Sequence, residues 1–83
     1  MAVLRFSNHV DVVMRERRIE REWVARTIAS PAWTSTDPGD ATLVRAFAPI
    51  AEREDRVLRV VYRPDGDALF VVTAFFDRGA RRP

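Results

Sequence analysis

Two apolar runs on either side of Pro64-Asp65-Gly66 constrain the fold of this chain more than any other feature of its sequence. Residues 56–63 and 68–76 are rich in valine and aromatic residues, which favour extended strands. Pro-Asp-Gly between them is typical of a tight turn. The sequence therefore predicts a β-hairpin over residues 56–76.

The turn residues predict how the two strands align. Proline holds φ at about −65°, which excludes Pro64 from the first central position of a two-residue I′ or II′ loop. We therefore expect a type I turn with Gly66 as the left-handed residue of a G1 bulge, so that Arg63 opposes Asp67. This register places on one face Leu58, Val60, Tyr62, Phe70, Val72 and Phe76, and on the other Val57, Arg59, Val61, Arg63, Leu69, Val71, Thr73 and Phe75.

The length of 83 residues is that of one domain. We expect a single α+β domain over residues 1–77 and a mobile basic tail at residues 78–83. The absence of cysteine excludes disulfides and thiolate metal sites, and the sequence contains no P-loop or GxGxxG motif, so no cofactor is expected. No apolar run reaches the roughly 18 residues of a membrane span and the N-terminus lacks an apolar h-region, which predicts a cytoplasmic protein without membrane contact.

All fourteen basic residues are arginine, and the net charge is +2. Residues 5–26 carry six arginines against four acids, residues 37–55 two against five, and residues 56–83 six against three. This distribution predicts basic patches at both ends of the chain. The use of arginine without lysine fits selection for bidentate phosphate recognition, but a GC-rich genome that favours arginine codons explains it more simply.

The remaining segments predict a strand, two helices and a further strand. Residues 3–6 form a short apolar run, and Ser7 or Asn8 is a suitable N-cap for a helix ending at Arg17-Arg18. A second amphipathic pattern runs from Ile19 to the stop at Ser30-Pro31. Residues 32–40 have the composition of a loop, with a short extended piece at Trp33, and residues 41–48 alternate as a strand does.

The expected order is therefore β-α-α-β-β-β. It gives a two-layer α+β domain in which two N-terminal helices pack on one face of a small, mainly antiparallel sheet. The opposite face stays available for binding.

Two residues, a histidine and a tyrosine, are the first group of candidates for chemistry. His9, the only histidine, lies at the start of the first helix, where it would bind an anion or act as an acid or base, or else pack beside Phe6 and Val13. Tyr62 is either a proton-transfer group or a core residue with its hydroxyl at the edge. One histidine and no cysteine leave no set of metal ligands, so no metal is expected.

Arginines on the strands are the second group of candidates. Arg45 and Arg59 lie inside strands and Arg63 at the hairpin end, so each should reach water, a phosphate or a carboxylate of a cross-strand ion pair. Trp33, in the predicted loop, is suited to stacking on a nucleic-acid base. Arg15 belongs to a basic helical stretch whose interleaved acids also fit a solvated face.

A family resemblance covers nearly the whole chain. The sequence resembles the bacterial domain-of-unknown-function family 4258 through Phe6-Ser7-Asn8-His9, Met14-Arg15-Glu16-Arg17-Arg18-Ile19, Val24, Ile28, Ser30-Pro31, Leu58-Arg59-Val60-Val61-Tyr62 and Val71-Val72-Thr73-Ala74-Phe75. That family looks like a branch of the RelE/ParE-type toxin superfamily, which has the same β-α-α-β-β-β order. The resemblance implies cleavage of messenger RNA at the ribosome and inactivation by a cognate antitoxin. It matches His9, Arg15, Arg17 and Arg59 to family positions.

Two hypotheses follow. In the first, the chain is a metal-independent ribonuclease in which Arg45 and Arg59 clamp the scissile phosphate and His9 or Tyr62 handles the proton. RNA contacts would then come from Arg15, Arg63 and Trp33.

In the second, the chain is a non-catalytic module that binds a protein or forms a homodimer through an exposed apolar patch of Val57, Val61, Leu69, Val71 and Phe75. Strand arginines with no acid within reach would favour the ribonuclease. Strand arginines neutralised by Glu52, Glu54 or Asp55 would favour the binding module.

Overall fold

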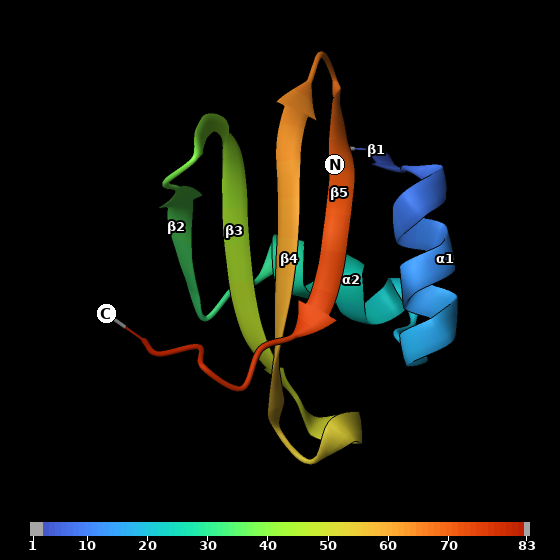
Figure 1. The fold of residues 1–83 in the computed structure, drawn as a ribbon, viewed down its shortest axis with the longest axis vertical. Coiled ribbons are helices and arrows are strands. Elements are labelled where there is room, and N and C mark those ends of the chain that lie inside the picture. Colours follow the sequence, from blue (N-terminus) through green and yellow to red (C-terminus); the bar gives the residue numbers. More distant parts are fainter. Residues whose placement is uncertain (1–2, 83) are drawn as a thin grey trace.

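The structure, a computed structural model, describes residues 3–82 and contains a five-stranded sheet with two helices on one face (Figure 1). The strand order is β1-β5-β4-β3-β2, in which β1 pairs with β5 in parallel and the other pairs are antiparallel. The elements are β1 (Val3–Phe6), α1 (Asn8–Arg17), α2 (Arg21–Ala29), β2 (Trp33–Asp37), β3 (Asp40–Ile50), the 3₁₀ turn η1 (Ala51–Arg53), β4 (Arg56–Asp65) and β5 (Ala68–Phe76). The predicted two-layer α+β class is confirmed.

Strand β2 was missed by the sequence analysis, which assigned most of residues 32–40 to a loop. Trp33 pairs with Phe47 of β3, and the pairing continues to Thr36 opposite Val44. The turn is confined to the segment after Thr36, where the carboxylate of Asp37 accepts the backbone N–H groups of Gly39 and Asp40. The element order is therefore β-α-α-β-β-β-β.

The helix boundaries follow from local hydrogen bonds. The Ser7 hydroxyl accepts the N–H of Val10 at 3.0 Å and begins α1. Arg18 ends α1 in the left-handed conformation, with φ at 56°, and its N–H is bonded to the carbonyl of Arg15. This single residue turns the chain toward α2, whose first turn carries the acidic Glu22 near the positive end of the helix dipole.

The hydrophobic core lies between the helices and one face of the sheet. It is formed by Val10, Met14, Ile19, Trp23 and Val24 from the helical layer and by Ile50, Leu58, Val60, Val71 and Ala74 from the sheet. Arg26 of α2 also reaches η1, where its guanidinium binds both carboxylate oxygens of Glu52 at 3.1 and 2.8 Å. This hydrogen-bonded pair lowers the pKa of Glu52 to about 2.

The hairpin is present, but its predicted register is wrong. Asp65 pairs with Ala68, so the loop contains only Gly66 and Asp67, and φ is positive at Gly66 but not at Asp67. That pattern fits a type II′ turn, with glycine first. Pro64 lies in β4 opposite Leu69, at a position whose missing N–H points away from β5, so proline is tolerated there.

A bulge in β5 changes the faces further. Val61 pairs with Thr73 but Tyr62 pairs with Val71, which leaves Val72 as the extra residue. The residues of β4 and residues 73, 75 and 76 lie on the predicted faces of the sheet. Residues 69–71 each lie on the face opposite to the one predicted. Val71 is fully buried against the helices, whereas Phe70 pairs with Arg63 on the other face.

The exposed apolar patch expected of the hairpin is therefore absent from the described chain. Val61 and Val71 are 4% and 0% exposed, and the large hydrophobic residues that are exposed are Val3 and Val12. Of its five residues, Val57, Val61 and Phe75 keep the predicted face, and Leu69 and Val71 lie on the helix side.

The chain after β5 runs past the ends of β4 and β3 towards β2 (Figure 1). The N–H of Asp77 donates to the carbonyl of Val57, and the guanidinium of Arg82 donates to the carbonyl of Ala32 at 3.1 Å. Mobility of this tail stays a prediction. Residues 1, 2 and 83, at the two ends of the predicted domain and tail, lie outside the described residues. No helix among the described residues is long and apolar enough to cross a membrane.

The positive φ of Gly66 can be tested with two glycine substitutions. Gly66→Ala should lower the free energy of unfolding by about 1–2 kcal/mol, because an L-residue is strained at positive φ. Gly79→Ala is the matched control, since φ is not positive there and the added Cβ would make an ordinary contact. Urea unfolding of both variants measures the difference. Equal effects of the two substitutions would contradict the positive φ at Gly66.

Candidate functional site

The face of the sheet opposite the helices carries the strand arginines. We call this surface the open face and define it as Trp33, Ser35, Arg45, Phe47, Arg59, Val61, Thr73 and Phe75. Strand pairing places these residues in two rows, Trp33-Phe47-Arg59-Phe75 and Ser35-Arg45-Val61-Thr73. The open face thus combines aromatic rings with guanidinium groups.

Arg59 lies at the centre of the first row. Its guanidinium carbon is 5.1 Å from the ring centre of Phe75 and 5.9 Å from that of Phe47, which are cation–π distances. Its Nη1 donates to Asp77 Oδ2 at 3.2 Å, and only 21% and 20% of the two side chains are exposed. The Nε of Arg59 is buried and has no hydrogen-bond partner in the described structure. The charge of Arg59 is therefore compensated, but its buried Nε–H group has no hydrogen-bond acceptor.

Arg45 is held in a second ion pair one row away. Its Nε and Nη2 donate to Asp37 Oδ2 at 3.3 and 3.1 Å. The other carboxylate oxygen accepts the N–H of Gly39 at 2.8 Å. The Gly39 hydrogen bond is the largest cause, followed by that from Arg45, of a pKa of Asp37 below its ordinary value. Asp37 therefore stays ionised and keeps Arg45 neutralised.

Trp33 extends the aromatic part of the open face to the edge strand. Its ring stacks on that of Phe47, with centres 4.8 Å apart and planes 9° apart. Phe47 is thereby buried, and Trp33 keeps partial exposure. Trp33 lies on a strand, not in the predicted loop.

The other predicted site residues are divided between the two layers. Arg63 lies on the arginine side of the sheet, with its guanidinium 4.9 Å from the ring centre of Phe70. Tyr62 packs against the core on the helix side. His9 and Arg15 are exposed on α1. The structure therefore brings Arg45, Arg59 and Trp33 together and separates them from both proton-transfer candidates.

The partners of the strand arginines were not identified from the sequence. Glu52 binds Arg26 instead, and neither Glu54 nor Asp55 forms an ion pair with a strand arginine among the described residues. The pairing of Asp37 with Arg45 could have been inferred, because the residue that opens a β-turn lies near the side chains of the two strands that the turn connects. The pairing of Asp77 with Arg59 was harder to infer, because the sequence shows only that Asp77 is the first acid after the last strand.

No group of three or more His, Cys, Asp or Glu side chains within residues 3–82 is arranged to hold a metal ion. The open face itself carries guanidinium groups, aromatic rings and hydroxyls. The carboxylates that contact it are those of Asp37 and Asp77, which are bound to Arg45 and Arg59.

Comparison with protein families gives one match. The sequence model of the family described as Domain of unknown function (DUF4258) matches residues 6–76. The matched span runs from the end of β1 to the end of β5 and includes the open face. No curated protein and no solved structure matches the chain.

The Arg59–Asp77 pair should contribute to stability. Asp77→Asn removes the charge partner of a largely buried guanidinium, and we expect the free energy of unfolding to fall by about 1–2 kcal/mol. Asp65→Asn, at an exposed position in the hairpin, is the matched control and should change it little. Chemical unfolding at neutral pH provides the measurement. An Asp77→Asn variant as stable as the control would show that the pair is not stabilising.

Acid should weaken the second ion pair. The folded-state pKa of Asp37 lies below the ordinary value of 3.8, so its stabilisation is present above that value and is lost as the pH falls towards the folded-state pKa. Wild-type protein should therefore lose more unfolding free energy than Asp37→Asn when the pH is lowered from about 5 to about 3. Parallel pH profiles of the two proteins would contradict the assignment.

Proposed function

The chain belongs to the domain-of-unknown-function family DUF4258, and we propose that it acts as a non-catalytic protein-binding module and not as an RNA-cleaving enzyme. The observation that carries this proposal is that the two arginines of the hypothetical phosphate clamp are paired with aspartates, Arg45 with Asp37 and Arg59 with Asp77. Neutralised strand arginines are what the binding hypothesis expects, although the acids are not those named from the sequence.

Two features argue against cleavage by the residues first considered. A guanidinium stabilises phosphate charge best when its own charge is uncompensated, and here each arginine already binds an aspartate through part of its donors. A proton-transfer group must also lie within hydrogen-bond reach of the reacting oxygen. His9 is on the exposed surface of α1 and Tyr62 packs on the helix side, so neither faces Arg45 or Arg59.

The open face has the composition of a protein interface. Tryptophan, aromatic residues and arginine carry most of the binding energy at such surfaces. Because the ion pairs are formed before binding, a partner need not supply counter-charges to cover them.

The proposed partner is a protein segment that lays an apolar stripe across Trp33 and Phe75. The resemblance to toxin–antitoxin proteins makes an antitoxin-like protein the candidate. In this role the chain would be a toxin-type protein that acts by binding.

RNA cleavage separates this proposal from the ribonuclease hypothesis. The test compares three purified proteins, the wild type, Arg59→Ala and Arg17→Ala. Each is incubated with messenger RNA, with and without ribosomes. Each is also induced in a bacterial host, where cleavage of messenger RNA is measured. We expect no cleavage above background from any of the three. Arg17 is the matched control, since it is an exposed arginine on α1. Cleavage that is lost in Arg59→Ala and retained in Arg17→Ala would overturn the proposal.

Binding is tested by co-expression with a small protein encoded beside this gene, followed by measurement of the affinity. Trp33→Ala and Phe75→Ala should each weaken the complex by about tenfold or more, as expected for interface aromatics. Val12→Ala, which changes an exposed side chain on α1, should leave the affinity unchanged. Thermal unfolding confirms that each variant is folded. A complex that tolerates both aromatic substitutions does not use the open face.

A further inference from the structure

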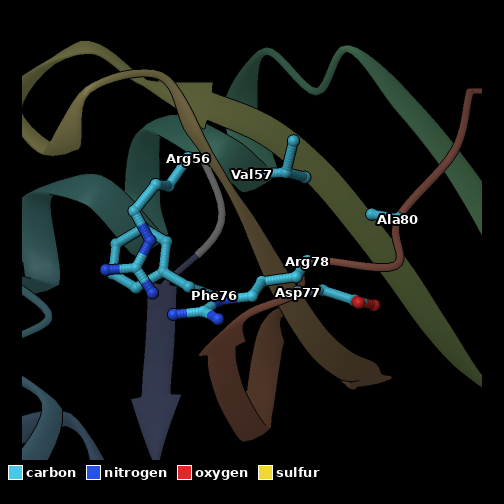
Figure 2. Close-up of a pocket in the computed structure, with 6 residues that line it drawn as sticks. All are labelled: Arg56, Val57, Phe76, Asp77, Arg78 and Ala80. Carbon is cyan, nitrogen blue, oxygen red and sulfur yellow. The ribbon is translucent and has the colours of Figure 1, made fainter.

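A hollow lies at the end of the sheet where β4 begins and β5 ends. Its volume is about 250 Å³, and it is lined by Arg56, Val57, Phe76, Asp77, Arg78 and Ala80 (Figure 2). The lining comes from the first residues of β4, the last residue of β5 and the tail that follows. Residues far apart in the sequence therefore form one site.

Two arginines of the hollow have no charge partner. Neither Arg56 nor Arg78 forms an ion pair or a side-chain hydrogen bond with any described residue. The guanidinium carbon of Arg56 lies 4.7 Å from the ring centre of Phe76. Figure 2 shows the guanidinium groups of Arg56 and Arg78 on the same side of the hollow, next to Phe76.

The acid in the lining does not neutralise them. One carboxylate oxygen of Asp77 binds Arg59 and the other accepts the N–H of Gly79 at 2.9 Å. The carboxylate points away from Arg56 and Arg78 (Figure 2). Glu54 and Asp55, which precede Arg56, are exposed and pair with neither arginine within the described chain.

A third guanidinium lies against the same ring. The guanidinium carbon of Arg53 is 4.8 Å from the ring centre of Phe76, and its Nη1 donates to the uncharged carbonyl of Arg18 at 3.2 Å. Phe76 therefore carries two stacked cations, and Arg78 adds a third nearby. Cation–π contacts hold such groups in place but leave their mutual repulsion uncompensated.

We propose that this hollow binds a phosphate monoester between Arg56 and Arg78. A guanidinium presents planar, paired N–H donors that match phosphate oxygens, so two of them can clamp one group. A monoester carries a charge of about −1.5 to −2 at neutral pH and balances two arginines, whereas a diester balances one. The stacking of Arg56 on Phe76 fixes its orientation before the ligand arrives.

This site is separate from the proposed protein interface. Its two clamping arginines lie outside the open face, and the proposal does not depend on whether that face binds a protein. Asp77 borders both regions but is committed to Arg59.

The test is calorimetric titration of the full chain with adenosine monophosphate at constant ionic strength, with adenosine as the ligand that lacks the phosphate. We expect saturable binding of the monophosphate and none of adenosine. Arg78→Gln and Arg56→Gln should each weaken binding by about tenfold, the value of one charged hydrogen-bonded contact. Arg17→Gln, an exposed arginine on α1, is the matched control and should bind as the wild type does.

Arg78→Gln is the decisive variant, because Arg78 is exposed and follows the last strand, so its loss should leave the thermal unfolding temperature unchanged. A further titration uses inorganic phosphate. If it binds as tightly as adenosine monophosphate, the phosphate group is the whole ligand. If adenosine monophosphate binds more tightly, the ligand is a nucleotide. Either result supports the site. Absence of saturable binding of both ligands to the wild type, or an equal loss in Arg17→Gln, overturns it.

Discussion

The alternation of side chains along β4 decides the character of both faces of this domain. Leu58 and Val60 are fully buried against the helices, and Arg59, between them, points to the opposite face. A shift of one residue in this central strand would carry a guanidinium into the apolar core and expose two of the largest buried side chains, at a cost no other contact here offsets. The burial of Leu58 and Val60 therefore fixes where Arg59 can lie. Its ion pair with Asp77 and its aromatic contacts follow from that position.

The parts of the fold that were predicted are those with strong periodic signals. The hairpin strands, both helices and β3 all show apolar residues at the spacing of their element. Strand β2 lacks that signal, because Thr34, Ser35 and Thr36 form an edge strand with exposed side chains and only Trp33 is apolar at its start. The turn was misjudged because Pro64 was placed in the loop. A proline is compatible with a strand where its nitrogen faces no partner.

The alternation of side chains along the strands also predicts part of the candidate site. This alternation places Arg45 and Arg59 on strand faces. It also places Tyr62 with Leu58 and Val60 on the core face, where the structure has it. Uniting Tyr62 with the arginines came from the family resemblance and not from strand geometry. The aspartate partner of Arg59 is 18 residues distant and reaches it only through the pairing of β4 with β5. Such a contact depends on the register, which the sequence did not determine.

The parallel pairing of β1 with β5 has a consequence for the order of folding. Val3 lies opposite Ala68, so the strand of this sheet that is synthesised first has its partner in the strand of the sheet that is synthesised last. The helices and the β2–β3 hairpin can form while the chain is still being synthesised, but the edge at β1 closes only after β5 has emerged. Of the strand pairings in the sheet, that of β1 with β5 joins residues farthest apart in the sequence and so carries the largest loop-closure entropy. Until then the apolar sides of β1 and α1 are a surface that a nascent chain must keep from other chains.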